Sequence, residues 1–140
     1  KDTTDAVAAQ LRDAGIKVKR TILPGSTFWN DWTKYSFSST NWNARPLGVQ
    51  IWALAYRSGE AWNEFGWSNA EFDAILTEAL ATPDTEKRRA LMAKGQKLIQ
   101  DEGVTIQPYW RSLYNHTKEG LEGAAHHIGF EYHPARMAWT

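Results

Sequence analysis

The chain contains no cysteine, which excludes disulfide bonds, thiolate chemistry and cysteine-ligated metal sites. It also has no excess of either charge, because 16 Lys and Arg residues balance 16 Asp and Glu residues. The sequence therefore lacks both the basic surface typical of nucleic-acid binding and an acidic tail. No apolar run approaches the roughly 18 residues that a membrane-spanning helix requires. The length of 140 residues corresponds to about one globular domain.

Motifs for catalysis are absent too. No G-x-S-x-G nucleophile elbow and no glycine-rich phosphate loop occur in the sequence. Asp84 and Glu86, and likewise Asp101 and Glu102, form acidic pairs that stand at predicted helix ends, where carboxylates commonly serve the termini. We therefore expect a protein that is not an enzyme and that carries no cofactor.

Tryptophan, by contrast, is abundant, with eight Trp against two Met. Trp is enriched where proteins bind ligands or partners. The most informative stretch is 39–46, a polar loop that carries Trp42, Asn43 and Arg45. Trp presents a flat apolar face with one N–H donor, and Arg presents a planar fork that matches a carboxylate. We expect these three residues to contact a ligand.

Each of these residues also has an ordinary structural alternative. Trp42 could be buried packing at a strand end, Arg45 could form a surface ion pair, and Asn43 could bond its own loop backbone. Trp62 and Asn63 lie on a second glycine-flanked loop and are further candidates for ligand contact, as one wall of a binding cleft.

The remaining tryptophans are predicted to pack inside the protein. Trp67 precedes a helix cap, where a hydrophobic staple is expected. Trp29, Trp32 and Trp52 stand at helical spacing from other apolar residues, which is typical of core positions.

Periodicity predicts an alternation of helices and strands. Helices are expected from a cap at Thr3 or Thr4 to Gly15, after a cap at Ser26, from 49 to 56, after a cap at Ser68, and from a cap at Thr82 to about Glu102. Strands are expected at 16–22, 37–42, 105–110 and 113–117. This order predicts an α/β fold with a mixed, largely parallel sheet flanked by helices.

Four motifs in register carry a family resemblance: Leu11 to Val18 (LRDAGIKV), Trp67 to Asp73 (WSNAEFD), Thr82 to Arg88 (TPDTEKR) and Ile106 to Trp110 (IQPYW). Together they resemble the C-terminal part of the ABC-importer solute-binding proteins for peptides, nickel and related solutes, extracellular solute-binding protein family 5. The resemblance implies part of one lobe of a type II periplasmic-binding-protein clamshell. It implies that 1–117 are a C-terminal α/β lobe and that 118–140 return toward the other lobe.

The implied function is capture of peptides or peptide-like solutes in a cleft between two lobes, followed by delivery to a membrane permease. The implied partners are that permease, the solute and an N-terminal lobe outside this chain, with no nucleic acid, and the implied location is the periplasm or the outer face of the membrane. Peptide-binding members hold the peptide ammonium with an aspartate, and Arg45 falls at that position here. A cation disfavours an ammonium group, so we expect an anionic or neutral ligand group near Arg45.

Two other functions fit the same composition. One is an aromatic-rich carbohydrate-binding module, which is more often an all-β sandwich, and the other is a non-catalytic structural or interaction domain. Four residues near the C-terminus, His126, His127, Glu131 and His133, could also suggest a metal site. Their spacing matches no recognised ligand pattern, so we expect polar surface and no metal there.

Overall fold

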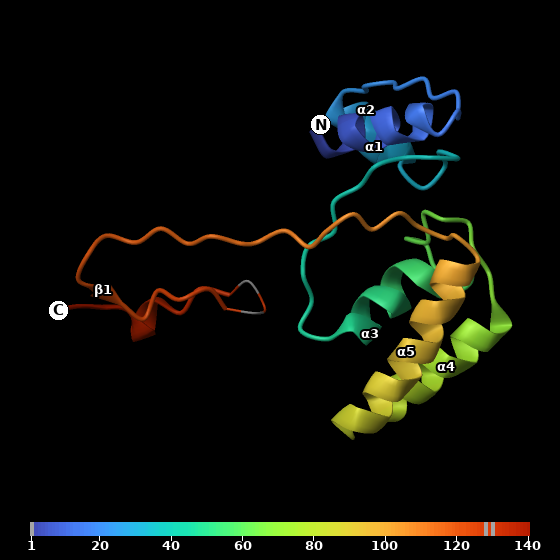
Figure 1. Ribbon diagram of the computed structural model, residues 1–140. Coiled ribbons are helices and arrows are strands. Elements are labelled where there is room, and N and C mark those ends of the chain that lie inside the picture. Colours follow the sequence, from blue (N-terminus) through green and yellow to red (C-terminus); the bar gives the residue numbers. More distant parts are fainter. Residues whose placement is uncertain (1, 128, 130) are drawn as a thin grey trace. The chain divides into compact units, whose positions relative to one another are not determined.

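The computed structural model describes residues 2–127, 129 and 131–140 of the chain (Figure 1). They form two compact units, Lys1–Asn41 and Trp42–Thr140, and each is described by itself. The boundary falls immediately before Trp42, so every predicted ligand-binding residue belongs to the second unit. The division expected between residues 117 and 118 stays a prediction.

The first unit contains the helices α1 (Asp2–Asp13) and α2 (Gly25–Asp31). α1 begins at Asp2, before both Thr3 and Thr4, so the predicted threonine cap is wrong. The acidic residues Asp2 and Asp5 in its first turn complement the positive end of the helix dipole. Gly15 has φ +84°, the left-handed conformation of a residue that ends a helix, and this prediction is confirmed.

α2 carries an aromatic cluster and not a buried core. Its N-cap residue is Pro24, so Ser26 lies inside the helix and the predicted serine cap is wrong. The rings of Phe28, in α2, and Tyr35, after it, stack with centroids 5.6 Å apart. Trp29 is 54% exposed, so its predicted core position is wrong.

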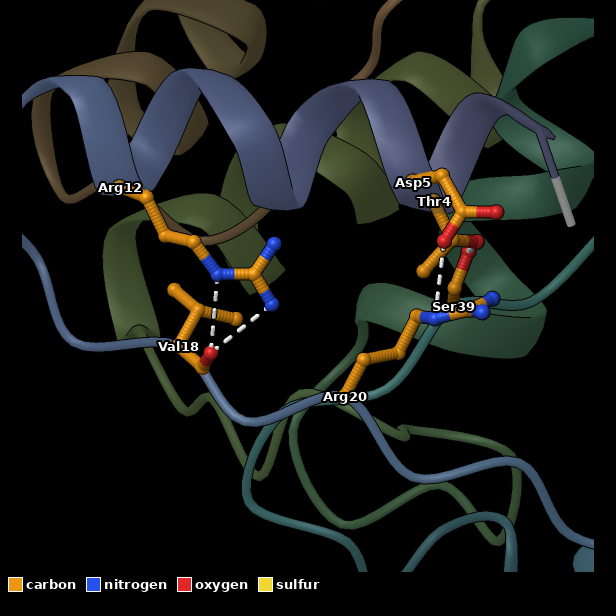
Figure 2. A network of polar contacts seen from close by, with 6 residues as sticks. All are labelled: Thr4, Asp5, Arg12, Val18, Arg20 and Ser39. Carbon is orange, nitrogen blue, oxygen red and sulfur yellow. Dashed lines mark hydrogen bonds and ion pairs between the residues drawn. The ribbon is translucent and has the colours of Figure 1, made fainter.

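The predicted strand at 16–22 is extended but pairs with no strand among the described residues. Side chains tie it to α1 instead, as Figure 2 shows. Arg12 donates from Nε and Nη2 to the Val18 carbonyl, at 3.1 and 2.9 Å, and Arg20 pairs with Asp5 at 2.8 Å. Alternating apolar residues favour an extended backbone, but a strand also needs a neighbour, and here α1 provides the polar partners.

The second unit is built on three helical elements. α3 (Gly48–Ile51) continues directly into η1 (Trp52–Tyr56), a π-helical turn, and α4 (Ala70–Ala81) and α5 (Thr85–Asp101) pack side by side (Figure 1). These bounds confirm the predicted helices to within a few residues. No described helix is long and apolar enough to cross a bilayer. The core comprises Val49, Trp52, Phe72, Leu76 and Ala79.

The two long helices use different caps from those predicted. Asn69 accepts a hydrogen bond from the Phe72 N–H at 2.9 Å, and Asp84 accepts one from the Lys87 N–H at 2.8 Å. The predicted caps at Ser68 and Thr82 are therefore early by one and two residues. The Thr82 hydroxyl is already engaged, because it donates to the Glu78 carbonyl at the end of α4. Asn and Asp are also stronger caps than Thr.

The packing expected of two tryptophans is confirmed in this unit. The Trp67 and Phe72 rings meet edge to face with centroids 4.8 Å apart, so Trp67 packs on the first turn of α4. With the cap at Asn69 these residues are N″ and N3, so the contact is not the N′–N4 pair of a hydrophobic staple. Trp52 is only 7% exposed, as a core position requires.

Strand pairing among the described residues is limited to one short antiparallel pair. β1 (Leu121–Glu122) pairs with β2 (Ala138–Trp139), with a single 3-10 turn, η2 (Pro134–Arg136), before β2. The strands predicted at 37–42, 105–110 and 113–117 are extended or irregular and not strands. The mixed, largely parallel sheet stays a prediction. A helix-rich chain is, however, unlike the all-β sandwich of most carbohydrate-binding modules.

We predict that Gly95→Ala destabilises the protein, although alanine normally favours a helix by about 1 kcal/mol. A Cβ at Gly95 would lie 2.6 Å from Cζ3 of Trp52, so the ring would have to shift within a packed core. The expected loss is about 1–3 kcal/mol, measured by thermal unfolding with circular dichroism. Gln96→Ala, at the next and exposed position of α5, is the matched control. A higher melting temperature for Gly95→Ala would contradict this packing.

Candidate functional site

Two of the predicted residues meet in an aromatic pair. Trp42 lies before α3 and Trp62 lies in the loop after η1, and their ring centroids are 6.0 Å apart with planes tilted by 56°. Trp62 is 48% exposed and Trp42 is half-buried. The two rings together therefore offer a partly exposed apolar surface with contributions from two separate loops.

A carboxylate that the sequence did not single out joins this pair. The indole N–H of Trp42 donates a 2.7 Å hydrogen bond to Oε1 of Glu64, which stands two residues after Trp62. The only signal in the sequence was an acid on the same loop as Trp62 and Asn63. A loop acid is usually solvated, so only the fold reveals that Glu64 turns toward Trp42.

Asn63 closes its own loop from within. Its side-chain Nδ2 donates to the backbone carbonyls of Arg57 at 3.1 Å and Trp67 at 2.7 Å. Its Oδ1 is buried and has no hydrogen-bond partner in the described part of the chain. The Asn63 side chain thus fixes the two ends of the loop relative to each other. It thereby also positions Trp62 and Glu64, the residues on either side of it in the chain.

The other two predicted residues lie on the Trp42 loop. Arg45 is half-buried, and its Nη1 donates to the carbonyls of Asn43 at 3.2 Å and Ala44 at 3.1 Å. Asn43 is exposed, and its backbone carbonyl serves as one of these acceptors. Both hydrogen bonds use Nη1, so the Nε and Nη2 groups of the guanidinium fork could still meet a carboxylate.

The loop of residues 59–67, which carries Trp62, is closed at its base by Ser58. The Ser58 N–H donates to Oδ1 of Asp73 at 3.1 Å, and the Ser58 hydroxyl oxygen accepts from the Asn69 N–H at 3.2 Å. The Ser68 hydroxyl also donates to the Ser58 hydroxyl at 3.0 Å. The 59–67 loop therefore leaves and rejoins the helical core at one point.

Tyr56 connects the core to this loop and has a perturbed acidity. Its ring lies 4.6 Å from the Phe65 ring, centroid to centroid. Burial raises the pKa of Tyr56, and the nearby negative charge of Glu64 raises it further, while a hydrogen bond with Thr105 acts in the opposite direction. Both raising effects disfavour the tyrosinate, so Tyr56 stays a neutral hydrogen-bonding group at ordinary pH.

A hollow in the first unit is separate from these residues. It measures about 490 Å³ and is lined by Arg12, Gly15, Ile16, Lys17, Val18 and Lys19. None of the five residues predicted to bind ligand belongs to it, and we assign it no role.

We predict that Glu64→Gln lowers the pKa of Tyr56 toward its ordinary value of about 10, because the substitution removes a negative charge that opposes the tyrosinate. Because the folded-state pKa is raised, the stability contributed by Tyr56 is complete below about pH 10 and is lost as the pH rises through that pKa. The alkaline loss should therefore be smaller in the variant.

NMR titration of the tyrosine ring carbons measures the pKa, and urea unfolding at alkaline pH measures the stability. Glu60→Gln, an exposed acid on the 59–67 loop, serves as the control and should leave Tyr56 unchanged. An unaltered Tyr56 pKa in Glu64→Gln would contradict the electrostatic coupling.

Comparisons with known proteins give two relatives. The chain is 24% identical over 134 residues to the dipeptide-binding protein DppE of Bacillus subtilis (strain 168), a match that covers 93% of this chain and 25% of that protein. It is 26% identical over 98 residues to the probable deoxycholate-binding periplasmic protein YgiS of Escherichia coli (strain K12), covering 70% of this chain and 18% of that protein.

The chain thus spans a quarter or less of the length of the curated relatives it matches. No family model matches it, and no solved structure matches it. Its relatives are both proteins named for binding a solute.

Proposed function

We propose that the chain is the C-terminal part of the solute-binding component of an ABC importer, of the extracellular solute-binding protein family 5 type. In this proposal the protein captures a peptide or peptide-like solute between two lobes and delivers it to a membrane permease. It acts in the periplasm or at the outer face of the membrane and performs no chemistry. The second lobe would come from residues outside this chain.

The similarity to a dipeptide-binding protein across 93% of the chain is the observation that carries the proposal. The sequence motifs quoted above extend over the same region, from Leu11 to Trp110. The two relatives are named for different solutes, a dipeptide and deoxycholate, so their names support a solute-binding role more strongly than any particular solute.

The aromatic pair of Trp42 and Trp62 is structural support for a binding role. A half-exposed Trp62 beside Trp42 leaves apolar ring surface for a ligand at a place where two loops meet. Pockets for small molecules commonly combine such apolar rings with a few polar groups. Here the polar groups are Glu64, on the Trp42 indole, and Arg45, on the Trp42 loop.

The extended segments support the proposed lobe. Residues 104–117 follow α5 without a helical turn (Figure 1). Their large apolar side chains are exposed, including Trp110 at 88% and Tyr114 at 80%. Exposed apolar rings on an extended backbone are costly in water and fit strands that pair within a larger sheet. We propose that 16–22, 37–42 and 104–117 join such a sheet in the longer protein.

The charges near Trp42 suggest a solute that carries both signs. Glu64 provides an anion and Arg45 a cation, as a peptide with a free ammonium and a free carboxylate would require. Arg45 can favour the carboxylate, as the sequence predicts, while Glu64 supplies the acid that is absent at position 45. Peptide binding of this kind needs no metal and no cofactor.

We predict that Trp42→Ala and Trp62→Ala each weaken solute binding by about tenfold or more, because each removes a ring whose full burial is worth about 1.5–3 kcal/mol, and about 1.4 kcal/mol corresponds to tenfold. Calorimetry on the protein as it occurs in its host, with the solute identified from the co-purifying ligand by mass spectrometry, measures the change. Trp29→Ala, at an exposed tryptophan of α2 that lies outside the pair and outside the proposed strands, should leave the affinity unchanged.

Blocked peptides separate the two charges. With an N-acetylated dipeptide, Glu64→Gln should have little further effect, and with a C-terminal amide, Arg45→Ala should have little further effect. If Arg45→Ala left affinity for every cognate solute unchanged, Arg45 would have no ligand contact. Tight solute binding by the 140-residue chain alone would contradict a cleft that needs a second lobe. Tryptophan fluorescence that ignores every candidate solute would favour a structural or interaction domain instead.

A further inference from the structure

The C-terminal segment closes into a loop with a tightly packed base. β1 and β2 pair through Leu121 with Trp139, and Gly123, with φ +75°, follows β1. A Cβ at Gly123 would overlap the backbone carbonyl of Arg136 in η2, so only glycine permits this approach. The loop of residues 124–135 therefore starts and ends at one place.

Three metal-ligating side chains meet inside this loop. Nε2 of His133 lies 3.4 Å from Oε2 of Glu131, and Nδ1 of His127 lies 3.9 Å from the same oxygen. The imidazole rings of His127 and His133 meet edge to face with centroids 5.0 Å apart. One ligand atom from each of the three residues lies within 4.8 Å of the other two.

These separations are close to those around a single bound ion. With metal–ligand bonds of about 2.0–2.1 Å, tetrahedral geometry places neighbouring ligand atoms about 3.3–3.4 Å apart. The His133–Glu131 pair already has that separation, and the His127–Glu131 pair exceeds it by about half an ångström. Small side-chain rotations would thus bring the three atoms around one centre.

We propose that His127, Glu131 and His133 bind a divalent transition-metal ion, with Zn²⁺ as the preferred occupant. Imidazole nitrogen and carboxylate oxygen are ligands of zinc and its neighbours, whereas Mg²⁺ and Ca²⁺ favour all-oxygen sites. Three protein ligands leave a position for water or an anionic group. The ion would hold the 124–135 loop closed.

The surroundings of the three ligands are compatible with a cation. Nδ1 of His127 accepts a hydrogen bond from the Gly129 N–H at 3.1 Å, so this nitrogen carries no proton. Its single lone pair must leave the Gly129 N–H in order to ligate an ion, and the metal–nitrogen bond would replace that hydrogen bond. The adjoining cavity of about 190 Å³ is also lined by Arg136, whose positive charge opposes the ion. Glu131 offsets that charge, and it is the one carboxylate in the cavity lining.

The sequence did not predict this site because its spacing follows no regular element. On a helix, residues 127 and 131 share a face but 133 does not. On a strand all three share a face, but at about 3.3 Å per residue 127 and 131 would lie about 13 Å apart, too far to bind one ion. In the structure the three side chains nevertheless cluster, whereas His126, the fourth residue considered in the sequence, is not one of them. The expectation of no metal was based on spacing alone, and distance is the stronger criterion.

The proposal is tested by titrating the full 140-residue chain, free of any histidine tag, with ZnCl₂ in a calorimeter. We expect one saturable Zn²⁺ site, lost on chelation, and no saturable binding of MgCl₂. Loss of a residue that only hydrogen-bonds to a metal ligand typically weakens metal binding by about 10–100-fold. His127→Ala, Glu131→Gln and His133→Ala each remove a ligand itself, so each should weaken Zn²⁺ binding by at least that factor.

His116→Ala is the matched control, because His116 is exposed and lies outside the cluster, so this variant should bind Zn²⁺ as tightly as the parent. Circular dichroism establishes that the helices persist in every variant, and Glu131→Gln, which preserves size, guards against a folding artefact. Co²⁺ titration gives an independent readout, since tetrahedral Co²⁺ absorbs visible light. Absence of saturable Zn²⁺ binding by the parent chain, or equal weakening by His116→Ala, would overturn the proposal.

Discussion

The second unit depends on the contact between the Trp52 ring and Gly95. Because Gly95 has no side chain, the indole packs directly against the backbone of α5, and the same ring lies 5.0 Å from Phe72 of α4. One side chain thus joins η1 to both long helices. Since η1 leads into Arg57 and Ser58, this contact also sets where the 59–67 loop begins. The position of the aromatic pair therefore follows from a packing contact in the core.

A second constraint is that extended segments of the chain have polar backbone groups to satisfy. In the first unit, Arg12 of α1 satisfies one such group by donating to the Val18 carbonyl. Arg20 ties the same segment to α1 through the Asp5 side chain and satisfies no backbone group. In 104–117, exposed Trp110 and Tyr114 indicate a surface that suits a neighbour. Side-chain ties can hold an extended segment locally, but only another strand satisfies every second backbone group.

The helices could be predicted because their signals are local. The apolar stripes, Gly15 and the region of Asn69 and Asp84 lie within a few residues of the structure they specify, and only the capping residue was misplaced. Strands could not be predicted to the same degree, since alternation specifies an extended backbone but not its partner.

In the candidate site, too, features with a local sequence signal could be predicted, and features that depend on a distant contact could not. Trp42 and Trp62 were predicted from residue type as candidates for ligand contact, and the structure places their rings together. Glu64 could not be found in this way, because its role depends on a contact across 22 residues of chain. Asn63 was expected to face a ligand, yet its amide nitrogen donates two part-buried hydrogen bonds to the backbone carbonyls of Arg57 and Trp67.

The closure of the 59–67 loop at Ser58 makes this part of the protein modular. Its two ends are fastened to the start of α4 by Ser58, Asp73 and Asn69, so the helices do not depend on what lies between. The entropic cost of closing a loop grows slowly with its length. Insertions and exchanges in the loop are therefore tolerable to the fold, and the chemistry presented beside Trp42 can diversify while the helical core stays the same.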